Sequence, residues 1–204
     1  MELIGMLDSP FVRRVAIGMK LLELPFTHRP LSVFGDFDAF AQINPVVKAP
    51  SLVLEDGSVL MESSLILDYL VRQTPRARHL VPDSPQAAAR AARLNGLALV
   101  ACEKSVQIVY ERQLRPETLQ HAPWLERVSR QLRAAWDTLE QTAGDLAAPS
   151  DAQNFGIAEL TVAVAWRFTQ NVTPDVIAAH RYPRLQAFST AAEATPAFQS
   201  TPAC

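Results

Sequence analysis

A serine stands near the start of the chain where a strand is expected to give way to a helix. Asp8-Ser9-Pro10 follows the short apolar run Glu2 to Met6, and Pro10 suits a first helical turn, where its missing N–H costs nothing. Unpaired N–H groups and the positive end of the dipole stabilise anions at a helix N-terminus. A thiolate is such an anion, so Ser9 could help to activate a thiol. The same serine could instead act only as an N-cap.

A second polar pair, Glu62-Ser63, lies at another expected strand-to-helix junction. Ser63 can cap the helix while Glu62 stays charged beside its N-terminus, which would be a structural role. An acid beside a hydroxyl and free helix N–H groups also complements a ligand that carries an ammonium and a carboxylate. Lys48 suits a ligand carboxylate as a point charge, although a lone surface lysine is commonly only solvated.

Composition disfavours several other classes of function. Ser9 to Val12 contains no thiol, which disfavours the mixed-disulfide chemistry of redox proteins. Cys102 and Cys204 cannot build a disulfide framework or a four-ligand zinc site, and the four histidines lack metal-ligand spacing. A net charge of −2 and a pI near 6.1 argue against nucleic acid and anionic membranes as ligands. Without an apolar span or a basic leader, the expected compartment is cytoplasmic.

The first eighty residues alternate short apolar runs with helical patterns. We expect strands at 2–6, 26–31, 51–54 and 59–61, and helices at 10–23, 36–42 and from Ser63 onward. Asp56-Gly57 between the last two strands is a strong hairpin signal. Arg13 and Arg14 on the first helix could add positive potential near Ser9, but such residues are usually solvated or salt-bridged. The predicted order is βαβαββα.

The remainder of the chain reads as helix interrupted by proline. Gln73 to Gln86 carries three prolines among polar residues and suits an interdomain connector. Helices are then expected at 87–114, 124–143, 157–170 and from Pro183. Cys102 is expected to be a small buried residue, and Cys204 to be exposed and incidental.

Three motifs in this order make the sequence resemble the cytosolic glutathione S-transferases, in particular the bacterial, serine-type members. They are Ser9-Pro10-Phe11-Val12-Arg13, Asn44-Pro45-Val46-Val47-Lys48-Ala49-Pro50-Ser51-Leu52, and Met61 to Leu70. The resemblance implies a thioredoxin-like α/β domain at 1–78, a linker at 79–85 and an all-helical domain at 86–204. The segment Asn154 to Glu159 departs from the family's capping box, because Gly156 replaces the usual Ser or Thr and leaves only Glu159 to reach back.

The resemblance also implies a set of site residues. Ser9 would donate its hydroxyl to the glutathione thiolate as the catalytic group, and the glutathione-binding residues would be Phe11, Lys48, Ala49, Pro50, Glu62 and Ser63, with Ser64 able to share the role of Ser63. Pro50 matches a proline that is cis in thioredoxin folds and exposes the backbone of Ala49 to the cysteinyl part of the ligand. Between the first strand–helix loop and the long helix, Leu7, Phe11, Phe34, Tyr110 and Leu114 are acceptor-pocket candidates that could equally be core.

The implied function is attack of the activated glutathione thiolate on a small, hydrophobic electrophile. Glutathione is the co-substrate, no metal is required, and a homodimer is expected because relatives of this family usually form one. An isomerase or a dehalogenase would use the same activated thiol on another substrate. A different class is also open, namely a scaffold of this fold that binds a protein partner with little or no catalysis, like the stringent-starvation and elongation-factor relatives.

Overall fold

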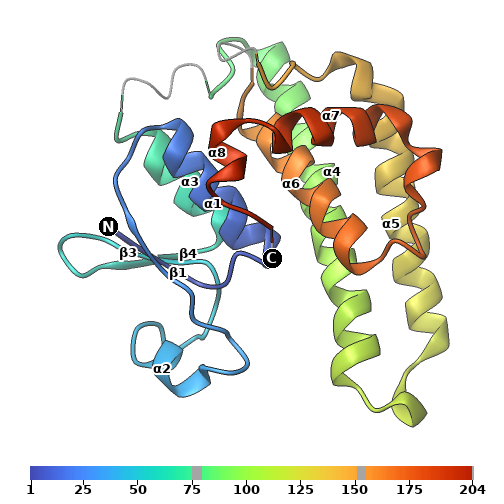
Figure 1. Ribbon diagram of the computed structural model, residues 1–204, viewed down its shortest axis with the longest axis horizontal. Helices are drawn as coiled ribbons and strands as arrows, with labels where there is room; N and C mark the ends of the chain where they lie inside the picture. Colours follow the sequence, from blue (N-terminus) through green and yellow to red (C-terminus); the bar gives the residue numbers. More distant parts are fainter. Residues whose placement is uncertain (75–79, 151–154, 204) are drawn as a thin grey trace. The chain divides into compact units, whose positions relative to one another are not determined.

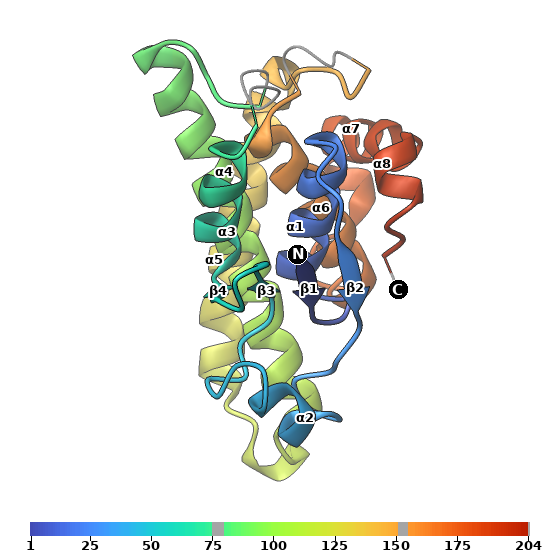
Figure 2. The same ribbon diagram turned by 90° about the vertical axis from the view of Figure 1, so that its left-hand side faces the viewer.

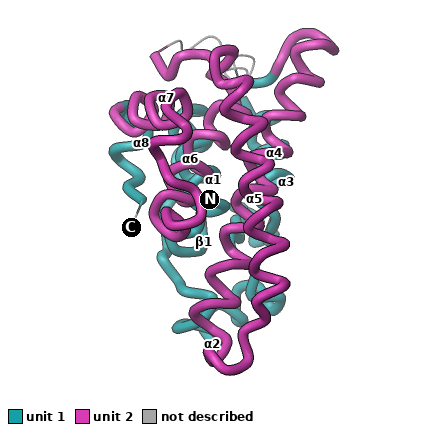
Figure 3. The backbone as a smooth tube through the Cα atoms, turned by 90° about the vertical axis from the view of Figure 1, so that its right-hand side faces the viewer, with its two compact units in different colours: residues 1–81, 195–204 teal, residues 82–194 magenta. Residues whose placement is uncertain are grey.

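The chain forms two compact units in the computed structural model, which describes residues 1–74, 80–150 and 155–203. One unit comprises Met1–Val81 and Thr195–Cys204, and the other comprises Pro82–Ala194 (Figure 3). The second unit is therefore inserted in the chain between two segments of the first. The sequence assigned the whole of 86–204 to the helical domain, and the segment after Ala194 differs from that assignment because it packs on the first unit.

The first unit has the predicted order βαβαββα and a four-stranded sheet, which confirms the expected fold. Its elements are β1 (Glu2–Ile4), α1 (Pro10–Leu21), β2 (Thr27–Arg29), α2 (Phe37–Ala41), β3 (Ser51–Val53), β4 (Val59–Met61) and α3 (Ser63–Val71). The strand order is β2-β1-β3-β4, with β1 parallel to β2 and β3 antiparallel to both β1 and β4. Helices α1 and α3 cover one face of the sheet and α2 lies on the other side (Figure 1). Figure 2 shows the four strands side by side.

The core of this unit lies between the sheet and helices α1 and α3. The strands contribute fully buried apolar side chains, and the two helices turn their apolar faces toward them; the buried set includes Leu3, Ile4, Val12, Val15, Ile17, Met19, Leu52, Ile66 and Leu70. Burial of each large side chain of this kind contributes roughly 1.5–3 kcal/mol relative to exposure. These contacts fix the ends of β1, β3, β4 and the two helices, where the candidate site residues lie.

Helix α1 also buries two arginines, Arg13 and Arg14. Of the two roles expected for them, solvated or salt-bridged, solvation does not hold because both side chains are buried. Nε of Arg13 donates a hydrogen bond of 2.8 Å to the carbonyl oxygen of Thr201, and its guanidinium lies 5.5 Å from the ring centre of Phe198. Phe198 belongs to α8 (Pro196–Gln199), which the sequence did not predict. Arg13 therefore fastens the last segment of the chain to α1.

The second unit is helical and has the predicted long helices with small shifts at their ends. They are α4 (Pro85–Val109), α5 (Ala122–Thr142), α6 (Ile157–Val172) and α7 (Pro183–Glu193), with short 3₁₀ turns at Glu117–Leu119, Ala143–Asp145 and Ala179–Arg181. The predicted 87–114 helix differs at its end, because Tyr110–Leu114 form a π-helical turn. Since α4 already begins at Pro85, that residue is helical and does not belong to the predicted linker.

Aromatic packing and side-chain caps hold the second unit together. The rings of Trp136 and Trp166 meet edge to face with centres 5.0 Å apart. The Glu159 carboxylate accepts a 3.2 Å hydrogen bond from the Gly156 N–H, as the half capping box predicted; Asn154 lies outside the described residues.

Cys102 is buried as expected, and Cys204 also lies outside the described residues. In the described ranges, no helix has both the length and the apolar character needed to cross a membrane.

Candidate functional site

The register of the sheet brings the three sequence motifs together at one end of the strands, where β1 and β4 finish and β3 begins. Ser51, the first residue of β3, pairs with Ile4 in β1 and with Met61 in β4. Because β3 runs antiparallel to both neighbours, its beginning lies beside the ends of the other two strands. The loop to Ser9 leaves the sheet at this end of the strands, and so does the chain at Glu62. The Pro50 turn enters the sheet at the same end. The order of three-residue strands thus assembles a site from segments that are distant in sequence.

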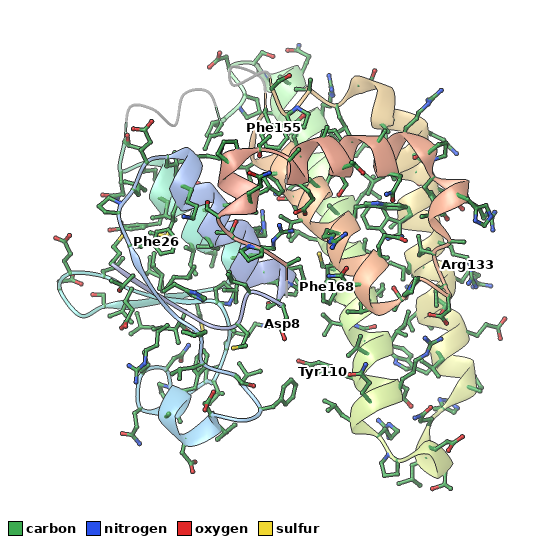
Figure 4. All side chains as sticks on the ribbon, viewed as in Figure 1. Asp8, Phe26, Tyr110, Arg133, Phe155 and Phe168 are labelled. Carbon is green, nitrogen blue, oxygen red and sulfur yellow. The ribbon has the colours of Figure 1, made fainter. Side chains whose placement is uncertain are left out.

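Ser9 is the N-cap residue of α1. Its backbone is extended, with φ −72° and ψ 122°, and its Oγ accepts a 3.4 Å hydrogen bond from the Val12 N–H. This bond uses a lone pair of the oxygen, so the hydroxyl hydrogen can still be donated to an anion. The capping role and the predicted catalytic role are therefore compatible. Phe11 lies half-buried in the first turn, and Figure 4 shows Asp8 in the loop that leads into α1.

Two buried polar side chains, Asn44 and Ser51, anchor the segment before β3 through hydrogen bonds. Nδ2 of Asn44 donates to the Ser51 Oγ over 2.8 Å, and the Ser51 hydroxyl donates to the carbonyl oxygen of Lys48 over 2.7 Å. The Ala49–Pro50 peptide bond is cis, as the resemblance implied. Pro50 is buried, Ala49 is half-buried and Lys48 is exposed. The network fixes the carbonyl group of Lys48 directly before Ala49, while the Lys48 side chain stays exposed.

Glu62, not Ser63, caps α3, and this corrects the capping role given to Ser63. The Glu62 carboxylate accepts hydrogen bonds from the N–H groups of Ser64 and Leu65, at 3.1 and 3.2 Å. Its backbone φ of 73° turns the side chain back over the first turn of the helix. Ser63 is the first helical residue and is only 1% exposed. Glu62 retains further acceptor positions, because an ionised carboxylate has about four lone-pair sites.

Arg14 connects α1 with the beginning of α3. One of its terminal nitrogens donates to the Oγ of Ser63 over 3.0 Å and to the Oγ of Ser64 over 3.1 Å. The arginine is 1% exposed, so its charge lies in the protein interior and not in solvent. A buried charge bonded to hydroxyls is a strong donor in a medium of low polarity. Arg14 therefore places positive charge behind the two serines.

Backbone strain is concentrated at this end of the strands. Among the described residues, three non-glycine residues have φ in the left-handed region, and two of them are Val47 and Glu62. Such a backbone costs of order 1–3 kcal/mol and is sustained at binding and catalytic sites by the surrounding structure. For the β-branched Val47, with φ 50°, the conformation is especially unusual. Val47 directly precedes Lys48, and Glu62 is itself a predicted ligand-binding residue.

The predicted acceptor-pocket residues are distributed over both units. Leu7 is half-buried after β1, whereas Phe34 before α2 is 58% exposed. Tyr110 and Leu114 lie in the π-helical turn of the second unit and are 44% and 55% exposed; Figure 4 labels Tyr110. The alternative that Phe34, Tyr110 and Leu114 are ordinary core is wrong. Their joint role as a pocket stays a prediction.

Four residues that help to build the site were not among the predicted site residues: Gly5, Arg14, Asn44 and Ser51. Gly5 has φ 130°, and its carbonyl oxygen lies 2.8 Å from Nε2 of His28. A glycine directly after a strand was the available sequence signal for a close approach. Within residues 1–74, 80–150 and 155–203, no three His, Cys, Asp or Glu side chains gather as metal ligands would.

Comparison with known proteins places this chain in a family. The model of the glutathione S-transferase N-terminal domain matches residues 3–78, and that of the glutathione S-transferase C-terminal domain matches residues 122–191. The chain therefore belongs to the glutathione S-transferase family. It is similar to the uncharacterized GST-like protein YibF of Escherichia coli, with 28% identity over 176 residues, which cover 85% of each chain.

Solved structures of the family share the fold over nearly the whole chain. A glutathione S-transferase of Methylobacterium radiotolerans in complex with glutathione sulfonate has a TM-score of 0.88 and 27% identity, and the match covers 98% of this chain and 93% of that one. A glutathione transferase family member of Pseudomonas fluorescens Pf-5 with bound glutathione has a TM-score of 0.83 and 29% identity, with 98% and 97% covered.

Proposed function

We propose that this protein is a serine-type glutathione transferase that activates the glutathione thiol for attack on a small, hydrophobic electrophile. Ser9 and the first-turn N–H groups of α1 stabilise the thiolate. The thiol proton passes to solvent, the sulfur forms a bond to an electrophilic carbon, and the leaving group departs with the electrons of the broken bond. The family membership and the glutathione carried by relatives of similar structure support the choice of co-substrate.

The observation that carries the proposal is the meeting of three segments at the beginning of β3. Each segment offers groups that suit one part of glutathione. The α1 N-terminus with Ser9 suits the thiolate, the backbone of Ala49 suits the cysteinyl amide as an added strand, and Glu62 with the α3 N-terminus suits the charged γ-glutamyl end. Lys48 suits the glycyl carboxylate. Phe11 and Pro50 are the apolar members of the predicted binding set; Phe11 is half-buried and Pro50 is buried.

The experiment that tests the proposal measures the ultraviolet difference absorbance of the thiolate when glutathione is titrated into the protein. At about pH 6.5, two units below the pKa of about 8.5 of a free thiol, only about 1% of unbound glutathione is ionised. A saturable thiolate signal is expected with the wild-type protein. Ser9→Ala is expected to raise the pKa of the bound thiol by about one unit and to lower turnover with electrophiles accordingly.

Ser84→Ala is the matched control for that substitution. Ser84 is the N-cap of α4, and its Oγ accepts a 3.2 Å hydrogen bond from the Ala87 N–H. The control loses the same kind of cap at a helix N-terminus that supplies none of the predicted glutathione-binding groups, so its thiolate signal is expected to equal that of the wild type. A folded wild-type protein without any thiolate signal would contradict the proposal and favour the scaffold alternative. An isomerase or dehalogenase would give the same signal and differ only in the electrophile consumed.

We also propose that the protein forms a homodimer. The first unit exposes apolar side chains around its β4–α3 junction, where Met61 is 39% and Leu65 is 66% exposed. Covering such side chains is a common reason for association. Leu65→Glu is expected to shift the sedimentation coefficient from dimer to monomer, and a wild-type protein that sediments as a monomer would contradict the proposal. A cytoplasmic location stays a prediction of the sequence.

A further inference from the structure

A buried carboxylate, Glu111, lies in the π-helical turn at which the α4–α5 hairpin of the second unit bends. The turn, Tyr110–Leu114, follows α4, and α5 then returns alongside α4 (Figure 1). Glu111 is 6% exposed. Its carboxylate accepts a 2.7 Å hydrogen bond from the His121 N–H and a 3.0 Å bond from Nε of Arg115. These donors offset the cost of burying the charge, which would be large without them.

The same turn is bonded at two further points. The side-chain amide of Gln120 donates to the carbonyl oxygens of Arg112 and Arg115, at 3.0 and 3.2 Å. A helix leaves its last carbonyl groups without partners inside the helix, so Gln120 supplies donors that this helix end lacks. Arg112 also forms an ion pair of 2.9 Å with Asp175, in the segment between α6 and α7. The turn is therefore fixed by bonds to Gln120, His121 and Asp175.

A π-helical turn changes the direction of the side chains that it carries. Its hydrogen bonds join residues five apart, whereas those of an α-helix join residues four apart, so the residues after it are rotated relative to the preceding helix. Such turns are rare and occur frequently at functional sites. Tyr110 and Leu114 begin and end this turn, and both are exposed. Loss of the bonds to Glu111 would let the backbone return to the commoner α-helical form and would displace both side chains.

We infer that Glu111 is a positioning residue that makes the protein selective for aryl electrophiles. Its bond to the His121 N–H keeps the π-helical turn, and the turn holds Tyr110 and Leu114 in the arrangement that binds the aryl group. An aromatic ring suits this pair, because it can stack with the tyrosine ring and pack against the leucine. The inference rests on the proposed function and on the predicted acceptor role of these two side chains.

The test compares the binding of two thioethers by calorimetry, so it does not require catalysis. They are S-methylglutathione and S-(2,4-dinitrophenyl)glutathione, which differ only in the group on the sulfur. The wild type is expected to bind the aryl thioether about tenfold more tightly, because the ring buries apolar surface. Glu111→Ala should reduce this ratio to about twofold or less and leave the Kd for glutathione within about twofold. Glu111→Gln should retain most of the ratio, because its amide oxygen can still accept the His121 N–H.

Glu140→Ala is the matched control. Glu140 also lies on a helix of the second unit, and its carboxylate also accepts backbone N–H groups, those of Arg184 and Leu185. Its substitution should lower the stability of the unit and leave the ratio of the two affinities unchanged. If Glu111→Ala does not fold, Gln120→Met enters the comparison, because it removes only the amide that bonds carbonyl groups of the turn. The ratio should fall in this variant as well.

A double-mutant cycle shows whether Glu111 acts through the two exposed side chains. In protein that carries both Tyr110→Ala and Leu114→Ala, the preference for the aryl thioether should already be lost. Adding Glu111→Ala should then not lower the ratio further. A further loss would mean that Glu111 acts by another route, and it would overturn the positioning role.

The outcomes separate this inference from the proposed function. Wild-type protein that binds neither glutathione nor the thioethers would overturn the proposed function and the inference with it. Wild-type protein that binds glutathione but does not prefer the aryl thioether, or that keeps this preference in Glu111→Ala, would overturn only the inference. An equal loss in Glu140→Ala would also overturn it. A loss of aryl preference in Glu111→Ala, absent in Glu140→Ala, supports the positioning role.

Discussion

Gly5 lies so close to Val12 that a Cβ atom on the glycine would be 2.7 Å from Cγ2 of the valine, and that atom would also be 3.1 Å from the Cβ of Ala49. Contacts below 3.0 Å force a neighbour to move. Gly5 is thus the point at which the end of β1, the first turns of α1 and the Pro50 turn touch. The separation between Ser9 and the Ala49 backbone depends on this residue having no side chain.

Gly5→Ala is therefore expected to weaken glutathione binding as well as stability. The positive φ costs about 1–3 kcal/mol, and the clash adds roughly another 1–3 kcal/mol. Gly57→Ala is the matched control, because Gly57 also has a positive φ of 86° but nothing within 4 Å of an added Cβ. The control should lose only the backbone term and keep its glutathione Kd. Chemical denaturation and calorimetry measure the two quantities, and equal effects of both substitutions on Kd would refute the positioning role of Gly5.

Glu62→Gln is expected to separate capping from ligand binding. Glutamine keeps an oxygen that can accept the N–H groups of Ser64 and Leu65, so the free energy of unfolding should fall by less than about 1 kcal/mol. The charge that attracts the ligand ammonium is lost, and the glutathione Kd should rise about tenfold. Glu140→Gln is the control, since Glu140 caps α7 through the N–H groups of Arg184 and Leu185. An unchanged Kd in Glu62→Gln would disprove the ammonium contact.

Lys48→Met is expected to reduce the preference for glutathione over γ-glutamylcysteine, which lacks the glycyl carboxylate. Lys48 is exposed, so its attraction for that carboxylate is screened and of order 1 kcal/mol, a factor of about five in Kd. The Kd for γ-glutamylcysteine should not change. Lys20→Met, at the end of α1, serves as the control. If Lys48→Met weakened both ligands equally, the glycyl assignment would be wrong.

Tyr182 is expected to make the second unit sensitive to alkaline pH. Burial raises the pKa of Tyr182 from 10.0 to about 12. The Asp137 carboxylate, which accepts a 2.9 Å hydrogen bond from the Tyr182 hydroxyl, adds to the shift. A raised pKa in the folded state contributes stability that is fully present below the unfolded pKa and is lost as the pH rises through the folded pKa. The stability advantage over Tyr182→Phe should hold to about pH 9 and shrink from about pH 10 to 12. Denaturation of both proteins across this range measures it, and an unchanged difference would contradict the prediction.

Features with local causes could be predicted from the sequence. Pro10 after Ser9 determines where α1 starts. Asp56-Gly57 predicts the hairpin, and the spacing of apolar residues predicts the long helices. Features that depend on distant partners could not. Glu62 is the N-cap residue of α3 because the chain leaves β4 with a positive φ at this position. No local sequence pattern predicts that backbone conformation.

The two arginines show the same limit. Arg13 and Arg14 look like a solvated pair because their acceptors are remote in sequence. Thr201 lies 188 positions after Arg13, and Ser63 lies 49 positions after Arg14. Only the fold brings these acceptors to α1, and only then does the charge of each arginine become part of the interior.

The bond from Arg13 to Thr201 also bears on how the protein is made. A ribosome synthesises the chain from its N-terminus, so Arg13 is translated long before the carbonyl that it binds. The helical unit, Pro82–Ala194, is contiguous and can fold while synthesis continues. The first unit is discontinuous and reaches its final packing only when Thr195–Cys204 have been released. Changes in the Thr195–Cys204 segment therefore act on the unit that carries Ser9 and Glu62, although this segment directly follows the helices of the other unit.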